Sequence, residues 1–215
     1  MHYTSVLFDL DGTLLDTLGD LTAAMNRTLT RHGLPERTRQ QMRAALGNGA
    51  RRLMELSVPA GTDGALFETL LAEYNADYAA HCRIETAPYP GVDALLQQLH
   101  AQGRKLAIVS NKPDEAVRAL RTEFFADTVP IAVGEKTGIR RKPAPDTLLA
   151  AMAQLGADPA STVYVGDSEV DIATARAAGL PCISVLWGFR DRDLLEQAGA
   201  QQFAADADEL ARLLD

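Results

Sequence analysis

Four aspartates stand directly after apolar runs of the chain, at spacings that could support chemistry. Asp9 and Asp11 follow one apolar run, and Asp167 and Asp171 follow another. Residues i and i+2 of an extended chain point to the same side, so Asp9 and Asp11 should face one direction. Carboxylates packed together away from water repel one another, and a divalent cation relieves that repulsion. Because hard oxygen ligands of this kind favour Mg²⁺, the aspartates predict a magnesium site.

Groups that could bind an anion follow two further segments. Ser110 and Asn111 lie between an apolar run and a predicted helix, where a hydroxyl and free backbone N–H groups attract negative charge. Lys142 lies in a basic stretch before another helix and could hold a phosphate as a point charge. Together with the aspartates, these residues predict a metal site beside a phosphate site, with a carboxylate available as nucleophile.

Each motif has a simpler structural explanation when it is taken alone. Aspartate and glycine are common in turns, and Ser110, Asn111, Asp167 or Ser168 could merely cap a helix. Lys142 could belong to a solvated loop. The first acidic block also partly resembles a calcium-binding loop, but it lacks the third acid and the preceding helix of that motif. The shared site is favoured by the occurrence of all four motifs at strand ends of one sheet.

Short apolar runs alternate with helical patterns along most of the chain. Continuous runs of this kind are typical of strands buried on both faces of a parallel sheet. The expected strands are 5–10, 105–109, 129–133, 162–165, 182–186 and a short one at 202–204. The expected helices are 91–102, 115–124 with Pro113 at the first helical position, 145–155, 168–178 and 206–214. The alternation predicts an α/β fold, in which ligands bind at the carboxyl ends of the strands.

The segment 16–87 interrupts this alternation. It contains no convincing strand, and its patterns predict four helices at 18–32, 36–46, 50–57 and 63–82. An insertion of this size is far longer than an ordinary connection between elements. We therefore expect an α/β core domain of residues 1–15 and 88–215, and an inserted all-helical cap domain of residues 16–87 joined to it by two hinges.

The composition is that of an ordinary globular protein. The chain has 215 residues, is 47% hydrophobic and 23% charged, and carries a formal net charge of −8. No apolar run approaches the ~20 residues that span a bilayer, and residues 1–10 lack the pattern of a secretory signal. The acidic balance argues against a nucleic-acid partner. With two distant cysteines, Cys82 and Cys182, we expect a reduced, cytoplasmic protein with no membrane partner.

The four motifs, in this order and at predicted strand ends, resemble those of the haloacid dehalogenase-like superfamily. Within it, the chain is similar to the phosphatases that carry a helical cap after the first strand. The resemblance covers nearly the whole chain and implies a Rossmann-like parallel sheet with the first strand central. The matching motifs are Asp9-x-Asp11-Gly12-Thr13, Ser110-Asn111, Lys142-Pro143 and Gly166-Asp167-x-x-x-Asp171.

The resemblance implies a role for each of these residues. Asp9 would be the nucleophile that forms an aspartyl-phosphate, and Asp11 the general acid and then base. Ser110, Asn111 and Lys142 would hold the transferring phosphoryl group. The cation and lysine would offset the repulsion between a carboxylate and a phosphate dianion.

The resemblance also implies a Mg²⁺ cofactor. Asp9, the backbone carbonyl of Asp11, and Asp167 would be its ligands, with Thr13 and Asp171 in support. An acid at position 11 discriminates within the superfamily, because the dehalogenases lack one there. The phosphonate-cleaving members resemble this chain less, because they carry a cap lysine in place of that acid's role. The resemblance therefore favours phosphoryl transfer over cleavage of carbon–halogen or carbon–phosphorus bonds.

A glycine-flanked loop in the expected cap looks like that of phosphoglycolate phosphatases. Asn48, Gly49 and Arg51 would contact the substrate there, although Arg51 and Arg52 could equally form a solvated helix face. We thus expect a phosphatase for a small-molecule phosphate monoester such as phosphoglycolate, acting as a monomer or homodimer. The alternatives are a sugar-phosphate mutase, a pyrophosphatase, and a non-catalytic phosphate-binding module.

Overall fold

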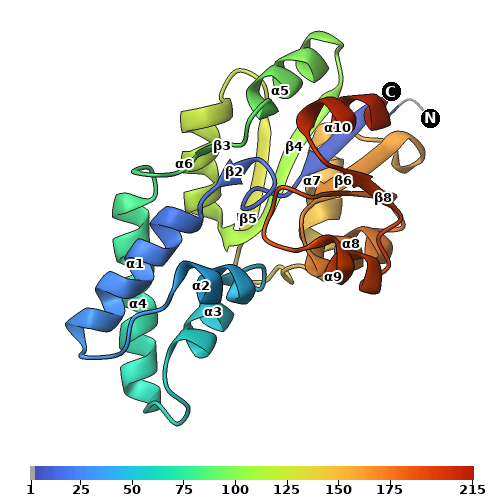
Figure 1. The fold of residues 1–215 in the computed structure, drawn as a ribbon. Coiled ribbons are helices and arrows are strands. Elements are labelled where there is room, and N and C mark those ends of the chain that lie inside the picture. The colour runs from blue at the N-terminus through green and yellow to red at the C-terminus, as the bar shows by residue number, and fades with distance from the viewer. Residues whose placement is uncertain (1–2) are drawn as a thin grey trace. The chain divides into compact units, whose positions relative to one another are not determined.

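The computed structural model describes residues 3–215 of the chain. It divides into two compact units, one made of residues 1–15 and 88–215 and the other of residues 16–87 (Figure 1). The first contains all the long strands, and the second is built around four helices.

The first unit is an α/β fold around a six-stranded parallel sheet, which confirms the predicted fold class. The strand order is β5-β4-β1-β6-β7-β8, so the first strand lies between β4 and β6. The strands are β1 (Ser5–Phe8), β4 (Lys105–Pro113), β5 (Ile131–Glu135), β6 (Thr162–Gly166), β7 (Cys182–Val185) and β8 (Gln202–Ala204).

The register of the central strands brings the predicted site residues to one edge. Phe8 of β1 is level with Ile108 of β4 and with Val165 of β6. Because the three strands are parallel, their carboxyl ends lie at the same edge of the sheet, where β4 continues to Pro113 and so includes Ser110 and Asn111. All four residues of β1 are buried, as expected for a strand covered on both faces.

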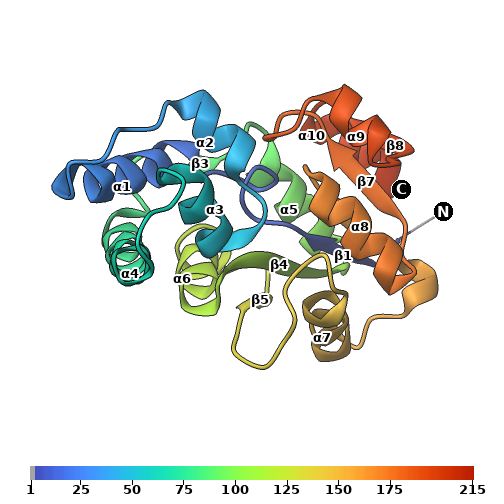
Figure 2. The same ribbon diagram turned by 90° about the horizontal axis from the view of Figure 1, so that it is seen from below.

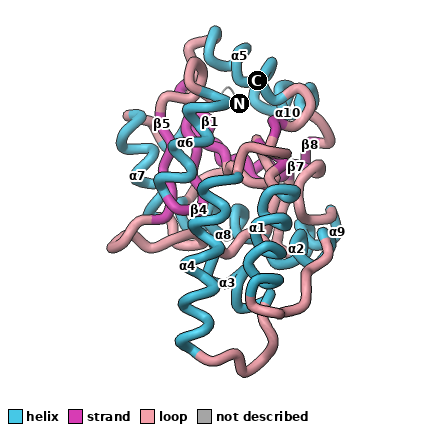
Figure 3. Tube along the Cα trace, turned by 90° about the vertical axis from the view of Figure 1, so that its left-hand side faces the viewer, coloured by secondary structure: helices cyan, strands magenta, loops and turns pink. Residues whose placement is uncertain are grey.

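Helices cover both faces of the sheet. Figure 2 shows α5 and α7 on opposite sides of β1 and β4. Helix α10 packs against α5, and α8 packs against α7. Figure 3 shows the strands of this unit between its helices. The helices are α5 (Val92–Ala101), α6 (Asp114–Phe125), α7 (Asp146–Leu155), α8 (Glu169–Ala178), α9 (Arg192–Gln197) and α10 (Ala207–Leu214).

The second unit is helical between its two connections. Helix α4 packs against α1, and its residues Leu70, Tyr74 and Tyr78 are buried. Phe67 and Leu71 of the same helix are only half-buried, whereas Asp77 is buried. The helices are α1 (Leu18–Arg31), α2 (Arg39–Ala45), α3 (Gly49–Ser57) and α4 (Gly64–His81).

The chain passes between the units through two short strands. β2 (Leu15–Asp16) and β3 (Ala87–Pro88) pair as a two-stranded sheet. Asp20 of α1 fixes the returning segment, because its buried carboxylate accepts hydrogen bonds from the backbone N–H groups of residues 84, 85 and 86. The hydroxyl of Thr86 donates to the same carboxylate at 2.8 Å.

Several details differ from the sequence-based expectations, among them the strand expected at 129–133, which is β5 (Ile131–Glu135), and the helix expected at 36–46, which is α2 (Arg39–Ala45). Pro113 is not the first residue of a helix: β4 extends to it, and α6 begins at Asp114. Helix α9 was not predicted, because a six-residue helix offers too little apolar periodicity. In the part of the chain from residue 3 onward, no helix has both the length and the apolar character needed to cross a membrane.

Candidate active site

Three buried carboxylates meet at the edge of the sheet. Asp9 follows β1, Asp167 follows β6, and Asp171 lies in the first turn of α8. Each contributes one oxygen to a group whose members all lie within 4.8 Å of one another. The structure therefore brings together residues that lie more than 150 positions apart in the sequence.

Lys142 is buried against these carboxylates. Its ammonium Nζ lies 2.8 Å from Asp9 Oδ1, 2.8 Å from Asp171 Oδ1 and 2.9 Å from the hydroxyl of Tyr164. The three contacts match the three donors of an ammonium group. Burial by itself would lower the pKa of Lys142, but Asp171 and Asp9 outweigh it and raise the pKa. Lys142 therefore remains a cation in this site.

One lysine does not balance three carboxylates. Burial raises the pKa of Asp9 to about 7, against the opposing effect of Lys142. Burial, with the charges of Asp171 and Asp9, also raises the pKa of Asp167 well above its usual range. With all three acids ionised, the site would carry a surplus of two negative charges, which a divalent cation would neutralise. The oxygen donors and this surplus fit Mg²⁺.

Two glycines allow the acids to come this close. Gly12 has a φ of +83°, and a Cβ atom there would lie 2.3 Å from Asp167 Oδ2. A Cβ atom on Gly166 would lie 2.3 Å from the carboxyl carbon of Asp171. A side chain at either position would push an acid out of the cluster.

Asp171 also helps to cap helix α8, as the simpler structural explanation of this motif predicts. Its Oδ2 accepts hydrogen bonds from the N–H of Ser168 at 3.1 Å and from the Ser168 hydroxyl at 2.5 Å. Its Oδ1 faces Lys142 and the hydroxyl of Tyr164. Asp171 therefore joins the start of α8 to the buried lysine.

The remaining motif residues of the α/β unit lie around this cluster. The carboxylate of Asp11 is outside the group of three and forms an ion pair with Lys112 at 3.0 Å. The hydroxyl of Thr13 lies 3.4 Å from Asp167 Oδ1. Ser110 Oγ accepts from the backbone N–H of Lys112, and the side-chain amide of Asn111 donates to the carbonyl of Lys142. Asn111 thus ties the end of β4 to the lysine loop.

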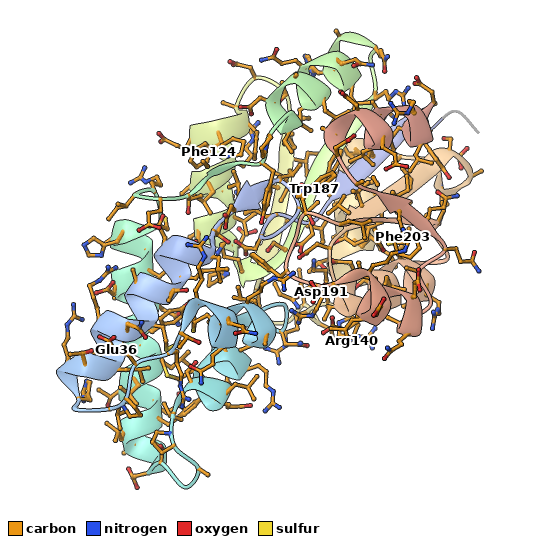
Figure 4. The ribbon with its side chains drawn as sticks, viewed as in Figure 1. Glu36, Phe124, Arg140, Trp187, Asp191 and Phe203 are labelled. Carbon is orange, nitrogen blue, oxygen red and sulfur yellow. The ribbon has the colours of Figure 1, made fainter. Side chains whose placement is uncertain are left out.

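Some residues at the site were missed by the sequence analysis. Lys112 directly follows the Ser110-Asn111 motif, and Tyr164 is the only residue of β6 with a phenol inside an otherwise apolar run. Either signal could have been noticed. The loop of residues 187–190 also reaches the acids, and Figure 4 labels its Trp187. It reaches Asp167 through the backbone N–H of Phe189, and a backbone donor leaves no mark in a sequence.

The predicted specificity residues belong to the helical unit. Asn48 is the residue before α3, and Gly49 is the first residue of that helix. Arg51 forms a two-pronged ion pair with Glu68, with both contacts at 2.8 Å, and its guanidinium lies 5.3 Å from the centre of the Phe67 ring. Contact of these residues with a substrate remains a prediction.

Comparison with known proteins identifies the family. A sequence model described as "Haloacid dehalogenase-like hydrolase" matches residues 6–185. This chain belongs to that family. Among curated members, a phosphoglycolate phosphatase of Xanthomonas campestris pv. campestris is 37% identical over 187 residues, covering 86% of this chain and 84% of the relative. An N-acetylmuramic acid 6-phosphate phosphatase of Pseudomonas aeruginosa is 33% identical over 190 residues, covering 88% and 84%.

Solved structures of the family have the same fold. A protein of Lactobacillus delbrueckii subsp. bulgaricus, named as a candidate phosphoglycolate phosphatase, superposes with a TM-score of 0.94 at 36% identity and covers 100% of this chain and 99% of its own. A predicted phosphoglycolate phosphatase of Haemophilus somnus gives 0.90 at 25% identity, covering 100% and 99%. The chain is therefore an enzyme of the haloacid dehalogenase-like hydrolases, and it is similar in sequence and fold to proteins named as phosphatases.

Proposed function

We propose that this protein is a Mg²⁺-dependent phosphatase that hydrolyses a small phosphate monoester, such as phosphoglycolate, through an aspartyl-phosphate on Asp9. One observation carries the proposal. Asp9 is buried at the end of the central strand, 2.8 Å from Lys142 and within the acid group of Asp167 and Asp171. The proposed nucleophile therefore lies beside a cation and beside carboxylates that could bind a metal ion.

The proposed reaction has two steps in which Asp9 and Asp11 alternate. In the first, a carboxylate oxygen of Asp9 attacks phosphorus, the bond between phosphorus and the ester oxygen breaks, and Asp11 gives its proton to the leaving oxygen. In the second, Asp11 takes a proton from water, the water oxygen attacks phosphorus, and inorganic phosphate leaves. Asp9 is then a free carboxylate again, and Asp11 is protonated for the next cycle.

The phosphoryl group needs positive charge around it. Lys142 is the buried cation beside Asp9, and we assign it, with Ser110 and Asn111, to hold the phosphoryl oxygens. Asp9, Asp167 and the backbone carbonyl of Asp11 would hold Mg²⁺, with Asp171 and Thr13 in support. The bound ion would neutralise charge on the phosphoryl oxygens.

The substrate assignment rests on the relatives and on the helical unit. The names of the compared proteins support a small phosphate monoester, and several of them specify phosphoglycolate. One relative instead acts, by its name, on a sugar phosphate. We propose that residues 16–87 form the cap that chooses among such esters, with Asn48, Gly49 and Arg51 contacting the substrate. The N-terminus of a helix beside an arginine suits a small carboxylate.

Phosphate release from an aryl phosphate with MgCl₂ tests the reaction. We expect turnover that requires Mg²⁺, is abolished by Asp9→Asn, and is retained in Asp127→Asn, which changes an exposed aspartate in the same way. Equal rates for the Asp9 variant and the unchanged protein would overturn the proposal. So would isomer accumulation instead of free phosphate from β-glucose 1-phosphate with a bisphosphate primer. A panel of esters ranked by kcat/KM, including phosphoglycolate and N-acetylmuramic acid 6-phosphate, tests the substrate.

A further inference from the structure

A loop that belongs to none of the four motifs also closes on the acid cluster. Residues Trp187–Arg190 connect β7 to α9, and we call them the clamp loop. Trp187 is half-buried, and the other three residues are buried. Figure 4 shows Trp187 on this segment, in the α/β unit. Its contacts reach the ends of both β1 and β6.

The backbone of the clamp loop binds the carboxylate of Asp167. The N–H of Phe189 donates to Asp167 Oδ2 at 2.6 Å, while Oδ1 of the same carboxylate faces the hydroxyl of Thr13. Hydrogen bonds to an ionised acceptor are short and strong. Because a backbone donor has no side-chain rotamers, this contact fixes the orientation of the carboxylate as long as the loop stays in place.

Close packing keeps the loop in place. A Cβ atom on Gly188 would lie 2.3 Å from Asp167 Cβ and 2.4 Å from the carbonyl oxygen of Gly12. These separations are far below a normal contact, so only glycine fits there without a shift of the loop or of the acid. The absence of a side chain at position 188 is thus what lets the loop approach Asp167.

Side chains at the two ends of the loop anchor it. The indole N–H of Trp187 donates to the carbonyl of Thr13 at 3.0 Å, and its ring packs against Tyr89 with 6.4 Å between the centroids. At the other end, the buried Arg190 binds Glu169 of α8 through Nε at 2.7 Å and Nη2 at 3.2 Å. One anchor reaches the β1 turn, and the other reaches the helix that follows Asp167.

We propose that the clamp loop is a positioning element of the metal site: its Phe189 N–H orients Asp167, and Trp187 holds the β1 turn that carries Asp11 and Thr13. Gly188 makes this approach possible. The inference rests on the proposed function, because a fixed Asp167 carboxylate serves metal binding. Partners of this kind, which hold a ligand in place, typically change metal affinity about 10–100-fold when they are lost.

Calorimetric titration of the whole protein with MgCl₂ tests the proposal without an activity assay. In Gly188→Ala we expect Mg²⁺ to bind at least about tenfold more weakly than in the unchanged protein. The matched control is Gly64→Ala, since a Cβ atom there meets nothing within 4 Å; we expect it to bind Mg²⁺ as the unchanged protein does. An affinity within twofold of the unchanged protein in folded Gly188→Ala would overturn the inference.

A milder variant covers the case in which Gly188→Ala does not fold. Trp187→Phe keeps an aromatic ring and removes only the indole donor to Thr13. We expect Mg²⁺ affinity and kcat for an aryl phosphate to fall several-fold, with KM changed less than twofold. Unchanged Mg²⁺ affinity together with unchanged kcat would overturn the role of Trp187, and with it the clamp.

The emission of Trp187 gives an independent signal, because it is the only tryptophan of the chain. We expect MgCl₂ to change this emission with the same midpoint as calorimetry, and the midpoint to move to higher Mg²⁺ in Gly188→Ala. If MgCl₂ leaves the emission unchanged while calorimetry records binding, the proposed role of the clamp loop at the metal site would be overturned. Failure of the proposed function is separate: the unchanged protein would then bind Mg²⁺ and release no phosphate.

Discussion

Each unit of this protein contains a buried aspartate, and the pKa values of these two aspartates are shifted in opposite directions. In the helical unit, Asp77 is buried with two arginines on its carboxylate, Arg27 at 2.5 Å and Arg31 at 2.8 Å. Burial alone would raise the pKa of Asp77, but the hydrogen bonds and charges of its partners outweigh it and lower the pKa. In the α/β unit, burial raises the pKa of Asp9 to about 7, because Lys142 is shared among several acids.

The difference distinguishes an acid that stabilises the fold from acids that we propose bind a metal ion. A single carboxylate with two cations is already satisfied and gains nothing from a metal. Several carboxylates that share one lysine keep an excess of negative charge, and perturbed pKa values of this kind are typical of functional sites. Asp77 and Asp9 are both buried, so burial does not distinguish them. What distinguishes them is the number of cations that contact each carboxylate.

The largest effect is expected from removing Lys142, the buried cation that contacts both Asp9 and Asp171. Lys142→Met takes away the partner of Asp9 and Asp171 while it keeps most of the side-chain volume. We expect phosphatase activity to fall about 10²–10³-fold, as when one stabilising donor is removed from a transition state. Lys105→Met, which changes an exposed lysine of β4, serves as the control. Activity within tenfold of the unchanged protein would show that Lys142 does not act on the phosphoryl group.

The next effect is on stability and concerns the satisfied acid. Asp77→Asn removes the charge that faces Arg27 and Arg31, and we expect the free energy of unfolding to fall by about 1–3 kcal/mol. The arginines are partly exposed and stay solvated, so the loss is smaller than for a fully buried pair. Denaturant unfolding measures it, and hydrogen exchange should place the loss in α1 and α4. Unchanged exchange in those helices would contradict this account.

The contribution of Asp77 should also depend on pH. Its pKa is lower in the folded state than in the unfolded chain, where it is about 3.9. The folded state therefore binds fewer protons, and the stabilisation is complete above the unfolded pKa. We expect the stability difference between the unchanged protein and Asp77→Asn to shrink as the pH falls below about 4. The groups that face the carboxylate are Arg27, Arg31 and His81. A stability difference that grows as the pH falls would contradict the lowered pKa of Asp77.

The smallest effect on stability is expected at the surface of the helical unit. Arg51 and Glu68 are about half exposed, and solvent screening makes such pairs weak. Arg51→Gln and Glu68→Gln should both leave the melting temperature almost unchanged. If Arg51 contacts the substrate, Arg51→Gln alone should raise KM for phosphoglycolate. Equal KM values in the two variants would remove Arg51 from the proposed specificity residues.

The sequence predicts the α/β fold and the meeting of Asp9, Asp167 and Lys142 because both follow from simple rules. Apolar runs form strands buried on both faces, and parallel strands bring their carboxyl ends to one edge. The ion pair of Asp11 with Lys112 was not predicted, since two flexible side chains can meet only once the backbone is placed. The contact of the Phe189 N–H with Asp167 was not predictable either, because every residue except proline carries the same donor.

The paired strands β2 and β3 have a consequence for how this protein can be remodelled. The chain leaves and re-enters the α/β unit through neighbouring backbone segments, with the N–H of Tyr89 donating to the carbonyl of Leu14 at 3.0 Å. An insert whose two ends lie side by side can be exchanged for another module without rerouting the host. Residues 16–87 can therefore be replaced by another module as one insert, and if they choose the substrate as we propose, such an exchange should change the ester preference while Asp9, Asp11 and Asp167 keep their backbone positions.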